Sequence, residues 1–193
     1  MILEKIESPK NIFLSGGADS ALLLYLLLKQ QPDTLTTALT WVKKDTYYKN
    51  LSAIKVMNWC MNATNNNNVV HIIKYADIQY EGCLDKLGEE YMNNNPICSG
   101  ITSFPKEDVE FGLPELSNND FRTHEGEKNV WQENGELYCP FINYDKKDIA
   151  ELYNKHNLFD LFELTNSCES KEMKEGHCGE CWWCKERFWA FGK

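Results

Sequence analysis

Arginine is the scarcest charged residue of this 193-residue chain. Only two of the 20 basic residues are arginine, Arg122 and Arg187, and the formal net charge is −9. An acidic chain with so few arginines lacks the clustered cations that nucleic-acid phosphates and anionic lipids require. We therefore expect no membrane partner and no nucleic-acid partner. Any two-pronged clamp on a carboxylate or phosphate must use one of these two arginines.

Long apolar runs are missing as well. No segment approaches the roughly 20 apolar residues of a membrane-spanning helix, and the longest run covers residues 21–28. Residues 1–8 lack the basic and apolar regions of a secretion signal. We expect a cytoplasmic protein, in the cytoplasm of the host if the source is a virus. In that reducing compartment the eight cysteines favour metal binding over disulfides.

The order of apolar segments and turn signals indicates an α/β fold. Strands are expected over residues 11–14, 35–42, 69–75, 97–101 and 137–142, and helices over 18–30, 46–61, 81–92 and 145–157. This alternation is typical of a parallel sheet covered on both faces. We predict a Rossmann-like doubly wound parallel sheet over residues 1–160 and a small cysteine-rich element over 161–193. A ligand of such a sheet lies at the carboxyl ends of the strands, where the loops after strands one and four face each other.

A glycine-serine turn follows the first predicted strand. It consists of Ser15, Gly16, Gly17, Ala18, Asp19 and Ser20. Two glycines let the backbone turn sharply and approach an anion, and the amides that open the next helix favour phosphate. The serines offer hydroxyl donors, and the aspartate can hold a magnesium ion beside a pyrophosphate. The turn is neither the lysine-containing Walker loop nor the dinucleotide G-x-G-x-x-G. A plain strand-to-helix connector is the alternative interpretation.

Four cysteines gather near the C-terminal end of the chain. They are Cys168, Cys178, Cys181 and Cys184, within 17 residues. Two C-x2-C steps and one more distant cysteine can close a tetrahedral zinc shell. An iron–sulfur cluster and free or redox-active thiols are the alternatives. The neighbouring His177 is not needed as a ligand, because four cysteines already complete the shell.

The glycine-serine turn matches the pattern S-G-G-x-D-S. In this pattern the chain resembles the PP-loop (N-type) ATP pyrophosphatases, of which it is the signature. The resemblance implies an adenine nucleotide alpha hydrolase-like fold and an enzyme that cleaves ATP between the α and β phosphates. It implies that the turn holds the pyrophosphate portion of ATP with its magnesium, and that Asp19 is a catalytic residue. It also implies that the end of the second strand, with Leu39 and Trp41, flanks the adenine.

The C-terminal part narrows the resemblance to one branch of that superfamily. Ser167-Cys168, nine further residues and then C-G-x-C-x-x-C, preceded by Pro140-Phe141 and Lys146, resemble the 7-cyano-7-deazaguanine synthases. The resemblance implies ATP, Mg²⁺ and Zn²⁺ as cofactors, a homodimer, and Lys146 as a catalytic residue that neutralises phosphate or the adenylate. The resemblance further implies 7-carboxy-7-deazaguanine and ammonia as substrates, and 7-cyano-7-deazaguanine, AMP and pyrophosphate as products.

The identity of the acceptor is left open by the sequence. The family places an Arg-Asn element after its third strand, whereas residues 76–96 contain no arginine. One alternative is a PP-loop ligase for another carboxylate, such as a modified base precursor or a peptide end. A second is a tRNA-thiolating enzyme with Cys98 or Cys139 as the persulfide carrier. A third is a non-catalytic nucleotide-binding protein.

Overall fold

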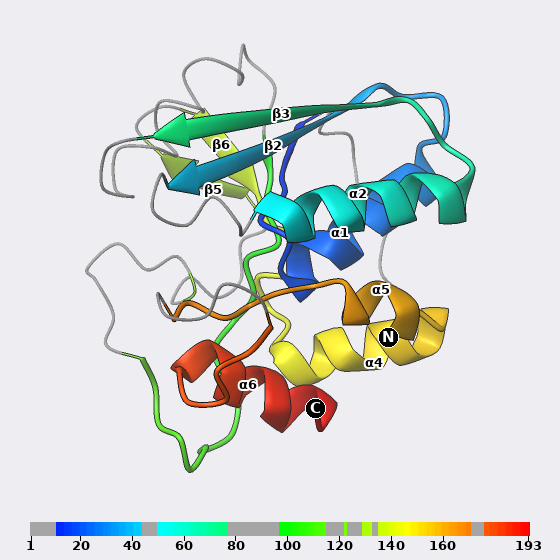
Figure 1. The fold of residues 1–193 in the computed structure, drawn as a ribbon. Helices are drawn as coiled ribbons and strands as arrows, with labels where there is room; N and C mark the ends of the chain where they lie inside the picture. The colour runs from blue at the N-terminus through cyan, green and yellow to red at the C-terminus, as the bar shows by residue number, and fades with distance from the viewer. Residues whose placement is uncertain are drawn as a thin grey trace.

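A computed structural model describes residues 11–43, 50–76, 97–114, 122, 129–132, 135–170 and 176–193 (Figure 1). The strands are β1 (Asn11–Phe13), β2 (Thr36–Lys43), β3 (Val69–Ala76), β4 (Ile97–Cys98), β5 (Asn129–Gln132) and β6 (Gly135–Tyr138). The helices are α1 (Ala18–Gln30), α2 (Asn50–Thr64), α4 (Lys146–His156), α5 (Phe159–Glu163) and α6 (Trp182–Phe191). No helix within these ranges is both long and apolar enough to cross a membrane.

The strands form one sheet in the order β3-β2-β1-β4-β6-β5. Five of them are parallel, which confirms the predicted α/β fold with a parallel sheet. The edge strand β5 runs antiparallel to β6 and was not predicted. Two residues separate β5 from β6 in the sequence, and so short a connection permits only antiparallel pairing.

The order in which the strands follow one another reverses at β1, which pairs with β2 on one side and with β4 on the other. The loops after β1 and β4 therefore meet, as expected for a ligand site at the carboxyl edge. Gly100, in the loop after β4, has its backbone against the first turn of α1. A Cβ at this position would lie 2.8 Å from the backbone nitrogen of Ser20 and 2.9 Å from the backbone carbon of Asp19. Only glycine permits this close approach.

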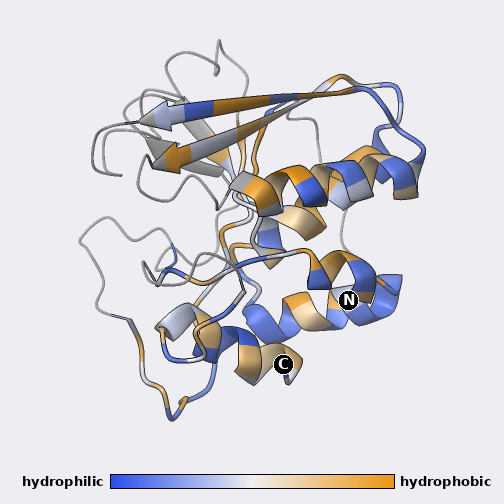
Figure 2. Cartoon of the chain, in the orientation of Figure 1, coloured by the Kyte–Doolittle hydropathy of each residue, from blue (hydrophilic) through white to orange (hydrophobic). Residues whose placement is uncertain are grey.

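The main core lies between the sheet and the helices. The leucine-rich α1 is buried from Ala18 to Leu28 except at Asp19, as predicted for a helix that is apolar on most faces. Figure 1 shows α1, α2, α4 and α5 on the same side of β2 and β3, and both strands mix apolar with polar residues (Figure 2). A smaller cluster on other strand positions includes Leu39 and Ile97. The helix predicted over 81–92 lies outside the described residues.

Several predicted boundaries change in the structure. The strand expected over residues 97–101 ends at Cys98, and the one expected over 137–142 is β6, which ends at Tyr138. Residues 139–144 instead form turns, in which Ile142 N donates to Cys139 O at 3.1 Å and Tyr144 N donates to Phe141 O at 2.8 Å. These turns lead the chain from the end of β6 directly to the start of α4.

Candidate active site and metal centre

The glycine-serine turn is fixed from two sides. Gly16 has a φ of +82°, and a Cβ there would lie 2.6 Å from the backbone nitrogen of Ala53 in α2. On the other side Asn166 N donates a hydrogen bond of 2.9 Å to Gly16 O. Both the left-handed backbone and the close contact require glycine at position 16. The turn is therefore held between α2 and the segment that leads to Cys168.

The two serines of the turn contact each other across its opening. The Oγ atoms of Ser15 and Ser20 are 3.0 Å apart. Gly17 N donates to Ser15 Oγ at 3.2 Å, and Ser20 Oγ donates to Gly17 O at 3.1 Å. Gly17 is the N-cap of α1 and offers no side chain to its first turn. The amides of that turn remain available to an anion, and the helix dipole favours one there.

The two predicted catalytic residues lie together. Lys146 Nζ forms an ion pair with Asp19 Oδ2, although the two residues are 127 positions apart in sequence. Lys146 is the first residue of α4, whose predicted N-cap Asp145 accepts hydrogen bonds from Lys147 N at 2.9 Å and Asp148 N at 3.1 Å. This cap fixes the start of α4, and with it the origin of the lysine side chain. The Lys146 side chain is 9% exposed.

A second buried ion pair adjoins the first and was not predicted from the sequence. Glu186 in α6 contacts Lys146 Nζ at 3.9 Å and binds both terminal nitrogens of Arg122, at 2.5 and 3.4 Å. Arg122 also donates to Thr102 O at 3.2 Å and to Ser103 O at 2.7 Å. Asp19, Lys146, Glu186 and Arg122 thus form a chain of alternating charge, which we call the charge chain.

The second arginine is engaged as well. Arg187 donates to Thr165 Oγ1 at 2.7 Å and to Phe162 O at 3.1 Å, with its guanidinium 3.6 Å from the Phe162 ring centre. Burial lowers the pKa of Arg187 to about 10, so the group stays cationic at neutral pH. Both arginines of the chain are thus tied into the protein by hydrogen bonds.

Three buried side-chain atoms have no hydrogen-bond partner within the described part of the chain. They are Asp19 Oδ1, Trp41 Nε1 and Ser103 Oγ. Asp19 follows β1, Trp41 lies near the end of β2, and Ser103 follows β4, so all three belong to the carboxyl edge of the sheet. Buried polar atoms are nearly always paired in folded proteins. Three exceptions at one edge make this edge the candidate site for a polar ligand.

This edge fits the predicted nucleotide and magnesium ion. The unpartnered carboxylate oxygen of Asp19 is the type of ligand that magnesium prefers. The Trp41 indole N–H is a donor without an acceptor among the described residues. Leu39 as a whole residue is 1% exposed, packs in the core with Ile97, and its backbone oxygen accepts a hydrogen bond of 2.8 Å from Leu14 N, so no part of it is open to adenine in this structure. The roles of these residues remain predictions.

A pocket of about 280 Å³ lies beside the glycine-serine turn. Its lining includes Ser52 and Lys55 from α2, Asn166, Arg187 and the apolar Phe162. Ser52 is also the residue against which Gly16 packs. The cations of the lining outnumber its one carboxylate, Glu163, and Phe162 adds an aromatic wall, a combination that suits a flat molecule with a negative charge.

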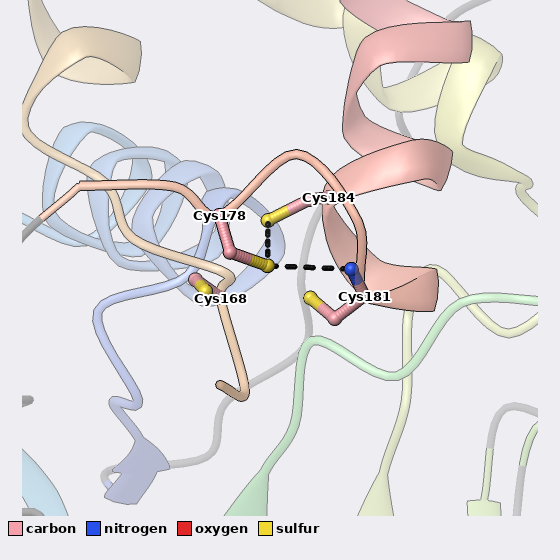
Figure 3. Close-up of side chains that lie close together, drawn as sticks. All are labelled: Cys168, Cys178, Cys181 and Cys184. Carbon is pink, nitrogen blue, oxygen red and sulfur yellow. Dashed lines mark hydrogen bonds between the residues drawn. The ribbon is translucent and has the colours of Figure 1, made fainter. Parts of the chain in front are cut away.

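The four predicted metal ligands converge in the structure (Figure 3). The Sγ atoms of Cys168, Cys178, Cys181 and Cys184 all lie within 4.8 Å of one another. Those of Cys178 and Cys184 are 3.9 Å apart. Sulfurs about 2.3 Å from a tetrahedral zinc are separated by about 3.8 Å. The thiol set therefore fits a tetrahedral metal ion, and an all-sulfur shell suits zinc or an iron–sulfur cluster.

The thiols of the cluster differ in how readily they ionise. Hydrogen bonds from the backbone amides of Cys181 and Glu180 lower the pKa of Cys178 to about 6. Burial raises the pKa of Cys184 to about 12 and also raises that of Cys168. Cys178 therefore ionises more readily than Cys168 and Cys184, from which a metal ion must displace protons. Metal affinity consequently falls as the pH falls.

The remaining described cysteines are core residues. Cys60, Cys98 and Cys139 are fully buried and form no disulfide. Burial raises the pKa of the Cys98 thiol far above its usual value and that of Cys139 to about 12. A persulfide carrier needs an accessible thiol that ionises near neutral pH. This environment counts against the tRNA-thiolating alternative.

The four-cysteine cluster and Lys146 lie in the part of the chain that matches a known family model. Residues 111–193 match the family of the queuosine biosynthesis protein QueC. The predicted resemblance is thereby confirmed for this part of the chain. Comparison with curated proteins and with solved structures gave no match.

The matched region holds both arginines and three of the four residues of the charge chain. The glycine-serine turn, which supplies Asp19, lies outside it. The structure therefore links QueC-like residues to an S-G-G-x-D-S turn through the ion pair between Lys146 and Asp19. A QueC-like enzyme is of the ATP-dependent ligase type, and this contact places the lysine beside the turn expected to hold ATP.

Proposed function

We propose that the chain is an ATP-dependent ligase that adenylates a carboxylate and amidates it with ammonia. The proposed overall reaction converts 7-carboxy-7-deazaguanine to 7-cyano-7-deazaguanine. The observation that carries this proposal is the state of Asp19, which pairs with Lys146 through one oxygen and keeps the other oxygen buried without a partner in the part of the chain that the structure describes. A carboxylate in this state, inside an S-G-G-x-D-S turn, supports binding of magnesium and pyrophosphate.

The reaction balances without an oxidant or a reductant. A carboxylate oxygen of the acceptor attacks the α-phosphorus of ATP, the α–β anhydride bond breaks, and pyrophosphate leaves. Ammonia then attacks the acyl carbon, loses a proton and expels AMP, which leaves an amide. The amide oxygen takes AMP from a second ATP, and loss of that AMP and of protons yields the nitrile. Two AMP and two pyrophosphate are released for each nitrile.

The residues of the turn act by positioning and by charge. The hydroxyls of Ser15 and Ser20 and the amides of the first turn of α1 bind the phosphate oxygens, as preorganised donors do in other phosphoryl-transfer sites. Asp19 holds the magnesium ion, which when bound neutralises charge that develops on the leaving pyrophosphate. Lys146 supplies a further positive charge beside the same carboxylate. We propose zinc for the four-cysteine cluster, where it stabilises the start of α6.

The pocket beside the turn is the proposed site of the acceptor. Its volume of about 280 Å³ accommodates a bicyclic base, and Phe162 offers an aromatic wall for such a ring. Lys55 is an exposed cation of this lining, whereas Arg187 is engaged by hydrogen bonds and Lys193 by an ion pair with Glu163. Lys55 is therefore the residue expected to attract the acceptor carboxylate.

Lys55→Ala should raise the KM for the carboxylate about tenfold, since a hydrogen bond to a charged group contributes about 1.5 kcal/mol or more. The KM for ATP and kcat should change little, because the interaction is made equally in the ground and transition states. Steady-state kinetics at saturating ATP test this. Lys29→Ala is the matched control, because Lys29 donates to Tyr25 Oη at the far end of α1. An unchanged carboxylate KM in Lys55→Ala would place the acceptor elsewhere.

Product analysis tests the proposed function directly. The purified protein, incubated with ATP, Mg²⁺, ammonium and 7-carboxy-7-deazaguanine, is expected to form AMP and the nitrile in a ratio of two to one. Both are measured by chromatography and mass spectrometry. ADP as the sole nucleotide product, or AMP formation that does not depend on a carboxylate, would contradict the proposal. AMP formation with another carboxylate alone would retain the ligase and change its substrate.

A further inference from the structure

We propose that Glu186 is a positioning residue that shares the Lys146 ammonium with Asp19 and so keeps Asp19 open to a divalent cation. The inference rests on the proposed function, because it concerns the magnesium ion expected at Asp19. It assigns a role in nucleotide binding to a residue of the cysteine-rich element, two positions after the metal ligand Cys184. That role goes beyond holding the C-terminal element together.

The position of Glu186 is fixed by its other partner. Glu186 is fully buried, and a buried carboxylate is retained only when its charge is compensated. Arg122 compensates it through two terminal nitrogens, and Arg122 is itself held by the carbonyls of Thr102 and Ser103. The rings of Phe104 and Trp182 cover the guanidinium, with centres at 4.5 and 5.0 Å. Glu186 is therefore a rigid negative charge.

Lys146 lies between two carboxylates of different exposure. Its partner Asp19 is 21% exposed, whereas Glu186 is 1% exposed and 3.9 Å away. A cation that binds Asp19 must compete with the lysine for that carboxylate. With Glu186 present, the Lys146 ammonium keeps a second anion when Asp19 binds the divalent cation. With glutamine in place of Glu186, Asp19 is the sole anion next to the buried ammonium among the described residues, and the lysine holds Asp19 more tightly.

The cysteine cluster determines where Glu186 lies. Cys181 is the N-cap of α6, and Cys184 lies in the first turn of the same helix. Four thiols within 4.8 Å of one another anchor the start of this helix, and α6 packs against α4, which carries Lys146. Folding of the cysteine element therefore brings the negative charge to the lysine. This provides a physical path from the metal centre to the nucleotide turn.

The test measures magnesium-dependent binding of a non-hydrolysable ATP analogue with an α,β-methylene bridge, by calorimetry over a series of Mg²⁺ concentrations. Glu186→Gln is expected to need about tenfold more Mg²⁺ for half-maximal binding. Opposite charges about 4 Å apart in a protein interact by more than the free energy that corresponds to a tenfold change in affinity. Glu107→Gln is the matched control. Glu107 pairs with Lys147, the neighbour of Lys146, at an exposed position, and its loss should leave the Mg²⁺ midpoint unchanged.

Two further variants separate positioning from folding. Glu186→Gln with Arg122→Gln removes both charges of the buried pair, so that no arginine is left uncompensated, and the same rise of the Mg²⁺ midpoint is expected. In a Lys146→Gln background, Glu186→Gln should have no effect on the midpoint, because it acts through the lysine. A merely structural role would lower binding equally with and without Lys146.

The outcomes distinguish this inference from the proposed function. Wild-type protein that shows no Mg²⁺-dependent analogue binding would overturn both. Wild-type protein that binds the analogue normally, together with an unshifted midpoint in the Glu186→Gln, Arg122→Gln double variant, would overturn the role of Glu186 alone. A shift of equal size in the Lys146→Gln background would also overturn it, because the effect would then not pass through the lysine.

Discussion

Asp19→Ala is expected to abolish carboxylate-dependent AMP formation and to leave the chain folded. The carboxylate offers a buried oxygen that has no partner within the described ranges, and it pairs with Lys146 through its other oxygen. Its removal takes away the proposed magnesium ligand, and loss of one preorganised electrostatic contact at a reacting group typically costs at least ~100-fold in rate. Lys146 keeps Glu186 at 3.9 Å as an anionic neighbour, so the variant does not strand a buried cation.

AMP release measures the activity, and thermal unfolding followed by circular dichroism measures the fold. The unfolding midpoint should stay within a few degrees of wild type. Asp160→Asn is the matched control, because Asp160 is an exposed aspartate in the first turn of another helix, α5. An Asp19→Ala protein that releases AMP at the wild-type rate would refute the assignment of the turn as the ATP site.

Loss of the metal is expected to destabilise the chain strongly. Structural zinc contributes ~10–16 kcal/mol of apparent free energy in small peptides. Loss of only about 5 kcal/mol from a chain of this size lowers the unfolding midpoint by ~10–20 °C. The start of α6 depends on Cys181 and Cys184, and α6 carries Glu186 and Arg187. Release of α6 would therefore leave Arg122 without its buried carboxylate partner.

Chelation of the metal and the variant Cys181→Ser test this, with the unfolding midpoint as the readout. Cys60→Ala is the control, because Cys60 is a buried cysteine in α2, outside the cluster. Native mass spectrometry should find one zinc per chain. Iron with sulfide would indicate a cluster instead, and a metal-free chain with an unchanged midpoint would contradict a structural metal. Metal release should increase as the pH falls, because protons compete for thiols such as Cys184, whose pKa burial raises to about 12.

Features that depend on neighbouring residues were predicted accurately. Helix α1 begins and ends where its leucine-rich composition indicated, and α4 has the Asp145 cap that its sequence predicted. Two glycines after a buried strand predicted a tight turn, and Gly16 adopts the left-handed backbone that such a turn uses. These predictions succeed because backbone propensity, capping and turn geometry are decided within a few residues.

Features that depend on distant pairing were missed or displaced. The edge strand β5 was not predicted, because residues 102–136 have no clear hydrophobic period and the strand forms by pairing with β6. Helix α6 was interpreted as part of a cysteine-rich element with flanking aromatics and not as a helix. Strand β6 ends earlier than its apolar run suggested, since residues 139–144 form turns.

The amino-acid sequence by itself determined the parallel α/β fold, because the order of its strands and helices is typical of that fold, and it determined the S-G-G-x-D-S turn and the four-cysteine set, because each is a local pattern with a fixed spacing. The tertiary structure decided which charges meet. Glu186 pairs with Arg122, 64 positions away in sequence, and Lys146 pairs with Asp19, 127 positions away. A sequence shows that a buried charge needs a partner, but only the fold selects that partner. The scarcity of arginine thus acquires a structural meaning, since Arg122 compensates Glu186 and Arg187 fastens α6 to Phe162 and Thr165.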